Sequence, residues 1–91
     1  MKIRFYIDPS TRLPHIYEHG VDEYEVEEVI QNPGEDRLSS KGTRIIIGQT
    51  FAGRYLRIVY KIKSNSIFVI TAYELKGKLL ATYKRRRRRR M

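Results

Sequence analysis

The chain has 91 residues, the length of one small domain, and no cysteine, which excludes disulfide bonds, a thiolate nucleophile and cysteine-ligated zinc. The formal net charge is +9, from 19 Lys and Arg against 10 Asp and Glu. Seven of the cations form a single run at residues 84–90, and the preceding 83 residues carry 12 cations and 10 anions. The strongly basic character therefore belongs to the C-terminus and not to the domain as a whole.

A block of like charges repels itself and resists burial, so residues 84–91 are predicted to be a disordered basic tail after a single domain of residues 1–83. Consecutive arginines suit phosphate, so we expect the tail to contact RNA or DNA; the alternative is a solvated segment that only aids solubility. An anionic membrane fits less well, because no lipidation motif or amphipathic helix accompanies the run. The N-terminal residues do not resemble a signal peptide and the apolar stretches are too short to span a bilayer, so we expect a cytoplasmic protein.

The first expected elements are a strand and a short helix. Apolar and polar residues alternate from Lys2 to Asp8, which predicts a half-buried strand. Pro14 to His19 is expected to form one or two helical turns, with Gly20 after the last of them.

A helix over residues 22–30 is the most clearly marked element. Asp22 has the position of an N-cap, with Glu25 at the reciprocal position of a capping box. Val21 and Val26 have the spacing of a hydrophobic staple across the same end. Residues 32–34, Asn-Pro-Gly, are expected to stop the helix.

The second half of the chain indicates a sheet. Residues 35–42 are polar and contain serine and glycine, which predicts a loop. Three strand-like segments follow at 44–50, 54–63 and 67–74, and the short turns between them are typical of an antiparallel meander. Residues 75–83 fit either a helix or a last short strand. The predicted fold is α+β, an antiparallel sheet of about four strands with N-terminal helices packed on one face.

No metal site or cofactor is expected. His15 and His19 have the spacing to share a helical face, with Glu18 between them, but the sequence offers no evident third ligand. The two glycine-rich phosphate-binding motifs, GxGxxG and GxxxxGK[ST], are also absent.

The side chains that remain are sufficient for RNA cleavage without metal, in which the ribose 2′-OH attacks its own phosphate and needs a base, an acid and cations. His19 is the candidate for proton transfer, because an unperturbed imidazole titrates near neutral pH. Purely structural interpretations also stand: His19 could cap the preceding helical turns, while Arg57 and Lys61 could form a solvated sheet face. The other candidates are Arg44, Arg54 and Arg57 for phosphate, and Tyr73, Glu74 or Tyr83 for proton transfer or base stacking.

Several short motifs occur in a fixed order along the chain: His19-Gly20-Val21, an acidic helix that ends at Asn32-Pro33, Arg44 with Ile47-Gly48, RYLRIVY at residues 54–60 and FVITAY at residues 68–73. This order resembles the BrnT-like toxins and, equally, the small proteins grouped as DUF4258. Both are placed with the RelE-like superfamily of bacterial toxin–antitoxin systems. The resemblance covers about residues 13–83.

The resemblance implies a compact RelE-like domain, a cytoplasmic endoribonuclease that uses no metal and is restrained by a cognate antitoxin protein. Matching the motifs assigns the catalytic positions to His19, Arg44, Arg57 and Tyr73. The BrnT-like pattern has arginine after Ser-Ala, whereas Tyr73 follows Thr71-Ala72 here, and this departure favours the DUF4258-like group. The expected RNA-binding residues are Arg54, Lys61, Tyr83, Lys84, Arg85, Arg86, Arg87, Arg88, Arg89 and Arg90.

Two alternative functions follow from the same residues. The first is a non-catalytic domain that binds RNA or the ribosome through its basic tail. The second is a degenerate toxin that acts as a protein-interaction domain, through an exposed sheet edge and the acidic helix residues Glu23, Glu27 and Glu28.

Overall fold

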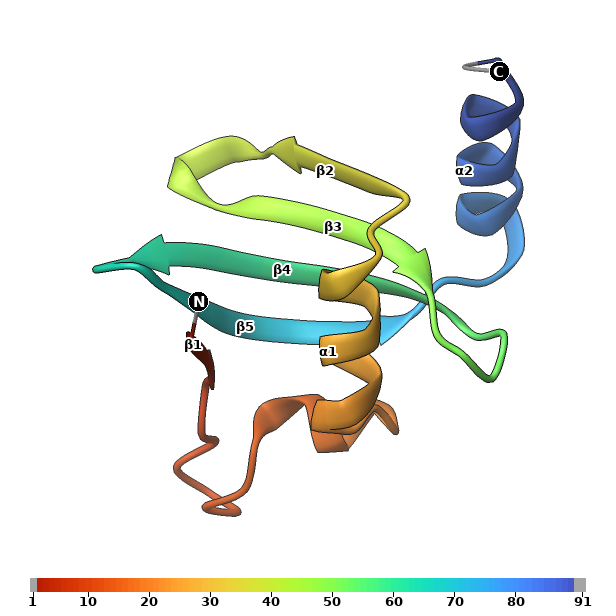
Figure 1. Cartoon of the computed structure of the whole chain (residues 1–91). Coiled ribbons are helices and arrows are strands. Elements are labelled where there is room, and N and C mark those ends of the chain that lie inside the picture. Colours follow the sequence, from red (N-terminus) through yellow and green to blue (C-terminus); the bar gives the residue numbers. More distant parts are fainter. Residues whose placement is uncertain (1, 90–91) are drawn as a thin grey trace.

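The computed structural model describes residues 2–89, in which five strands are combined with two α-helices and two short 3-10 helices (Figure 1). Among these residues, no helix combines the length and the apolar character that a bilayer crossing requires. The elements in chain order are β1 (Lys2–Phe5), η1 (His15–His19), α1 (Glu23–Gln31), β2 (Glu35–Leu38), η2 (Ser40–Gly42), β3 (Arg44–Gln49), β4 (Tyr55–Lys63), β5 (Ser66–Glu74) and α2 (Gly77–Arg89).

The five strands form one mixed sheet in the order β1-β5-β4-β3-β2. β3, β4 and β5 form the predicted antiparallel meander, in which Ile46 lies opposite Ile58 and Ile58 lies opposite Ala72. β1, however, pairs with β5 in parallel. The α+β class is confirmed, whereas the expectation of about four antiparallel strands holds only in part, because alternation along residues 2–8 indicates a strand without indicating its direction.

β2 was not expected from the sequence. Residues 35–42 were predicted as a loop, but Glu35–Leu38 pair antiparallel with β3 and Ser40–Gly42 form η2. β2 is an edge strand whose last three residues are exposed. An edge strand of this kind lacks the apolar alternation by which a half-buried strand is recognised.

Helix α1 begins as the sequence predicted. The Glu25 amide donates to Asp22 Oδ1 at 2.9 Å, and the Asp22 amide donates to Glu25 Oε1 at 3.2 Å, which completes the capping box. Val26 and Val29 are fully buried against the sheet. The helix approaches the sheet closely at Gly48, where an added Cβ would lie 3.0 Å from Val29 Cγ1.

Each face of the sheet has its own hydrophobic cluster. The face that carries η1 and α1 holds the larger cluster, which includes Ile16, Val26, Leu56, Ile58 and Val69. Helix α2 packs on part of the opposite face, so the expectation of helices on one face is correct for η1 and α1 but does not extend to α2. The smaller cluster on that second face consists of Ile45, Ile47, Leu75 and Tyr83, with Tyr55, Val59 and Leu80 packed against it.

The ambiguous segment 75–83 is helical and is anchored by Tyr83. This side chain is 4% exposed, and its ring meets that of Tyr55 edge to face at 6.0 Å. The Tyr83 hydroxyl fills the space beside Gly34, since a Cβ built there would lie 1.9 Å from it. Burial raises the pKa of Tyr83.

The basic run does not separate from the domain at residue 84, because residues 84–89 continue α2. Repulsion within the run predicts disorder, whereas the fold supplies an anion from β2 that binds the run. Arg86 donates to both oxygens of Glu35, from Nε at 3.1 Å and from Nη2 at 3.1 Å. Arg87 Nη1 donates to the Gly34 carbonyl at 2.6 Å, which ties the following residue of the helix to the segment just before β2. Residues 90 and 91 lie outside the described part of the chain.

Candidate functional site

Three of the four predicted catalytic residues come together at one end of the β4–β5 pair. Arg57 and Tyr73 are direct partners across the two strands, and Arg57 Nη1 donates to the Tyr73 hydroxyl at 2.7 Å. The His19 ring lies 6.0 Å from the Tyr73 ring, centroid to centroid, at an interplanar angle of 58°. His19 is exposed and the other two side chains are half-buried, so the group is accessible to a large ligand.

Chain topology explains how His19 reaches the sheet. β1 pairs only with residues 66–69 of β5, and η1 packs against β5. Ile16, which is 1% exposed, anchors η1 in the larger core, and the ring of His15 contacts that of His19 at 5.3 Å. Gly20 then turns the chain away with a left-handed φ of 69°, a conformation that favours glycine.

Arg44, the fourth predicted residue, lies apart from this group. It pairs with Tyr60 across β3 and β4 and so lies on the α1 face, whereas Arg57 pairs with Ile47 on the α2 face. Arg44 Nε donates to the Tyr60 hydroxyl at 3.2 Å and to Asp36 Oδ1 at 3.3 Å. These two partners raise the pKa of Arg44, the tyrosine hydrogen bond first and the charge of Asp36 second. Arg44 therefore ties β2, β3 and β4 together.

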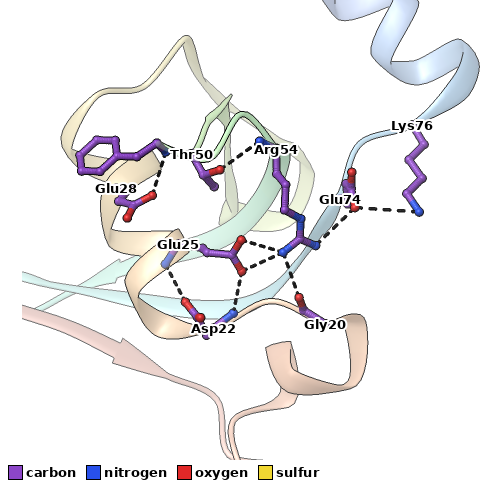
Figure 2. Close-up of polar contacts among 9 residues, drawn as sticks. Gly20, Asp22, Glu25, Glu28, Thr50, Arg54, Glu74 and Lys76 are labelled. Carbon is purple, nitrogen blue, oxygen red and sulfur yellow. Dashed lines mark hydrogen bonds and ion pairs between the residues drawn. The ribbon is translucent and has the colours of Figure 1, made fainter.

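Arg54 is bound to carboxylates, which leaves it poorly placed for the phosphate contact predicted from the sequence. Its Nη1 donates to both oxygens of Glu25, at 2.9 and 2.7 Å, and its Nη2 donates to Glu74 at 3.3 Å (Figure 2). The same Nη1 reaches the Gly20 carbonyl at 3.1 Å. Burial opposes the charge of Arg54, but the hydrogen bonds and charges of Glu25 and Glu74 raise its pKa overall.

The position of these partners gives Arg54 a supporting role. Gly20 follows His19 in the chain, and Glu74 follows Tyr73, so Arg54 holds the neighbours of two site residues. Glu25 is at the same time the capping-box residue of α1. The sequence pattern contained no signal for this network, because its members come from four separate segments.

Several cations gather on the α2 face of the sheet, which also holds Glu35, bonded to Arg86 and Arg37. The open part of the α2 face carries a set of cations that we call the basic sheet surface: Arg4, Arg57, Lys61 and Lys63. Phe68 lies among them, opposite both Arg4 and Lys61, with Lys63 Nζ 5.4 Å from its ring. Two strand carboxylates lie on the other face, because Asp36 pairs with Ile46 and Glu74 with Leu56. The acidic residues of α1 lie on that other face as well.

The remaining predicted RNA-binding residues fall into two groups. Tyr83 is buried, and Arg86 and Arg87 are bonded to β2 and to the segment before it. Lys84 Nζ lies 5.1 Å from the Tyr55 ring, and Arg85 and Arg88 are exposed on α2. Arg89 ends the described helix, and Arg90 lies outside the described residues.

One group of side chains has ligand atoms close enough together to hold a metal ion. Asp8, His15 and Glu18 have donor atoms that all lie within 4.8 Å of one another. His15 Nδ1 is 3.4 Å from Asp8 Oδ2 and 3.5 Å from Glu18 Oε2. Asp8 also accepts from the Ser10 amide at 2.8 Å, and this bond is the largest cause of its lowered pKa. Hydrogen bonding accounts for the arrangement, and His19 is not a member of it.

The fold and the site define a small α+β domain in which a short helix brings a histidine against an Arg–Tyr pair on a mixed sheet. Within that class, the chain belongs to the family described as Domain of unknown function (DUF4258), whose sequence profile matches residues 15–74. The match begins at η1, ends with β5 and includes the whole His19–Arg57–Tyr73 group, while α2 follows it. No curated protein and no solved structure matches the chain.

Proposed function

We propose that this protein is a metal-independent endoribonuclease, related to the BrnT-like toxins of the RelE-like superfamily and active in the cytoplasm. The observation that carries the proposal is the convergence of His19, Arg57 and Tyr73 from η1, β4 and β5. These side chains supply a group able to transfer protons, a fixed cation and a hydroxyl, which are the requirements of RNA cleavage by the neighbouring 2′-OH.

In the proposed reaction the 2′ oxygen bonds to phosphorus and the bond from phosphorus to the 5′ oxygen breaks. The products are a 2′,3′-cyclic phosphate and a 5′-hydroxyl, so no water or co-reactant is consumed. His19 exchanges a proton with the attacking or the leaving oxygen, because it is the exposed member of the group. Arg57 holds the phosphate oxygens as negative charge develops, and Tyr73 orients Arg57 through the 2.7 Å hydrogen bond.

The basic sheet surface supports RNA as the substrate. Its cations continue from Arg57 along β4 to Lys61 and Lys63, and Phe68 offers an aromatic ring between them. A chain of phosphates laid along this surface would meet cations and a stacking ring while avoiding the acidic face.

The test is cleavage of a 5′-labelled RNA in excess EDTA by wild-type protein and by His19→Ala, Arg57→Ala and Tyr73→Phe. We expect cleavage that leaves a cyclic phosphate, loss of at least about a hundredfold in rate for His19→Ala and Arg57→Ala, and a smaller loss for Tyr73→Phe. Lys41→Asn is the control, because it also removes one cation, from an exposed position whose φ of 61° asparagine tolerates. Full activity in both alanine variants, with circular dichroism unchanged, would reject this site.

A second function, a non-catalytic domain that binds RNA or the ribosome, is favoured by one observation. Tyr73 stands where the BrnT-like pattern has a cation, whereas the basic sheet surface does not depend on that position. Salt-sensitive RNA binding without chelator-resistant cleavage would select this function. A cognate antitoxin belongs to the first proposal, and the acidic residues of α1 (Glu23, Glu27 and Glu28) are the surface we assign to a basic protein partner.

A further inference from the structure

A cleft of about 500 Å³ lies between the β3–β4 turn and α2, within the size range of small-ligand sites. Its walls are formed by the turn on one side and by the basic end of α2 on the other. Tyr55, at the start of β4, lies in the cleft on the same sheet face as Arg57, two residues further along the strand. The cleft is therefore within about 7 Å, along β4, of the proposed cleavage group.

The charge of the cleft is positive. Lys84, Arg87 and Arg88 line it, and its lining includes no carboxylate. Helix α2 holds these cations in place, because Tyr83 is buried and Arg86 is bonded to Glu35. Cations carried on neighbouring positions of one helix repel one another, and an anion bound between them relieves that repulsion.

The turn that forms the other wall presents an exposed aromatic ring on a rigid backbone. Phe51 is 79% exposed, although the sheet clusters would be the ordinary place for its ring. Its backbone amide donates to Glu28 Oε1 at 2.9 Å, which ties the turn to α1. Thr50, which is 4% exposed, accepts from the Gly53 amide at 2.9 Å through its carbonyl and from the Arg54 amide at 3.0 Å through its hydroxyl.

We infer that this cleft binds a nucleotide, with the base stacked on Phe51 and the phosphate held by Lys84 and Arg88. An exposed aromatic ring that shares a cleft with several cations is the combination by which proteins hold single-stranded nucleic acid. The inference rests on the proposed function in one respect: the proposed function makes an unpaired nucleotide of RNA the expected ligand. A free nucleotide has the same chemistry, and the experiment separates the two.

The experiment measures fluorescence anisotropy of a labelled single-stranded RNA of eight nucleotides with 2′-O-methyl riboses. The methyl groups remove the attacking hydroxyl, so binding is measured whether or not the protein cleaves RNA. We expect Phe51→Ala to weaken binding at least about fivefold, which corresponds to one stacked base. Tyr24→Ala is the matched control, because Tyr24 is 77% exposed on α1, outside the cleft, and its removal should leave affinity unchanged.

The cations have a separate readout. The double variant Lys84→Gln, Arg88→Gln should reduce the slope of log affinity against log salt by about 0.7, since the two side chains hold one phosphate and each neutralised phosphate of a single strand contributes about 0.7. Phe51→Ala should leave that slope as it is, because stacking releases no counterions. An unchanged slope in the double variant would overturn the assignment of the phosphate to these side chains.

Competition identifies the source of the nucleotide. If unlabelled RNA displaces the labelled oligonucleotide far better than adenosine monophosphate does, the cleft binds RNA. If adenosine monophosphate competes equally well, and Phe51→Ala also weakens the binding of adenosine monophosphate, the cleft is a free-nucleotide site. Equal affinity of Phe51→Ala and Tyr24→Ala, or equal binding of an abasic oligonucleotide, would overturn the inference. If no preparation of the protein cleaves RNA but the cleft still binds the oligonucleotide, only the ribonuclease proposal is rejected.

Discussion

Arg86 and Glu35 form an ion pair with two hydrogen bonds although 51 residues separate them in the chain. Glu35 is 8% exposed, and Arg37 adds a third hydrogen bond at 3.2 Å. Burial alone would raise the pKa of Glu35, but the hydrogen bonds and charges of Arg86 and then Arg37 lower it below the ordinary value of 4.5. This pair converts a self-repelling run of arginines into the last turns of a helix.

Glu35→Gln should lower the free energy of unfolding at pH 7 by about 1–2 kcal/mol, since it removes a charged acceptor from a partly exposed guanidinium. The pKa of Glu35 is lower in the folded chain than in the unfolded one, so its contribution is present above about pH 4.5 and is lost as the pH falls through the folded value. Urea denaturation at pH 7 and pH 3 should therefore show a difference between wild type and variant that is smaller at pH 3 than at pH 7. Glu27→Gln serves as the control, and a difference as large at pH 3 as at pH 7 would contradict the charge-based explanation.

Removal of residues 84–91 should destabilise the domain, by about 1–3 kcal/mol, because Glu35 is then left buried without its main cation. A disordered tail would predict no change. Thermal unfolding of the truncated chain distinguishes the two, and truncation of residues 90–91 alone is the comparison that keeps Arg86 and Arg87. Equal stability of the short and the full chain would show that the helix end contributes nothing.

Gly34→Ala should destabilise the fold by about 1–3 kcal/mol, because its Cβ would overlap the buried Tyr83 hydroxyl. Tyr83→Phe removes that oxygen, after which the nearest ring atom, Cζ, lies 3.3 Å from the Cβ position. The double variant should therefore lose less stability than the two single variants together. A double-mutant cycle in urea measures this coupling, and strict additivity would contradict the proposed overlap.

Arg54→Lys should cost about 1–3 kcal/mol of stability, since lysine keeps the charge but cannot bond Glu25, Glu74 and the Gly20 carbonyl at once. If the proposed ribonuclease site is correct, the same variant should reduce cleavage while RNA affinity stays near that of wild type. Lys76→Ala is the matched control, because Lys76 lies 3.9 Å from Glu74 and is exposed. An Arg54→Lys variant as stable as wild type would show that the network does not stabilise the fold.

Local patterns predicted some elements and missed others for identifiable reasons. The capping box at Asp22 and Glu25 and the meander of β3, β4 and β5 depend on neighbouring residues and were predicted correctly. β2 was missed because its residues are polar, as is common in an edge strand. The helical end of α2 was missed because Glu35, the anion that stabilises it, is remote in the sequence.

The candidate site shows the same limit. His19, Arg57 and Tyr73 were proposed together and do lie together, whereas Arg44 was proposed with them and lies apart, bonded to Tyr60 and Asp36. Both faces of β3 are apolar, with Ile46 in one cluster and Ile45 and Ile47 in the other, so the alternation within the strand does not indicate on which face Arg44 lies. The partners of Arg54 come from elements whose contacts no local pattern specifies.

The cations of β4 and of the end of α2 lie away from the glutamates of α1, and this uneven distribution of charge gives the molecule a permanent electric dipole. In the field of a polyanion such a dipole rotates before contact, so that the α2 face arrives first and the α1 face turns away. Added salt should then slow association more than it speeds dissociation. The fold thereby sets the orientation in which the protein first meets a polyanion, as well as the surface that then binds it.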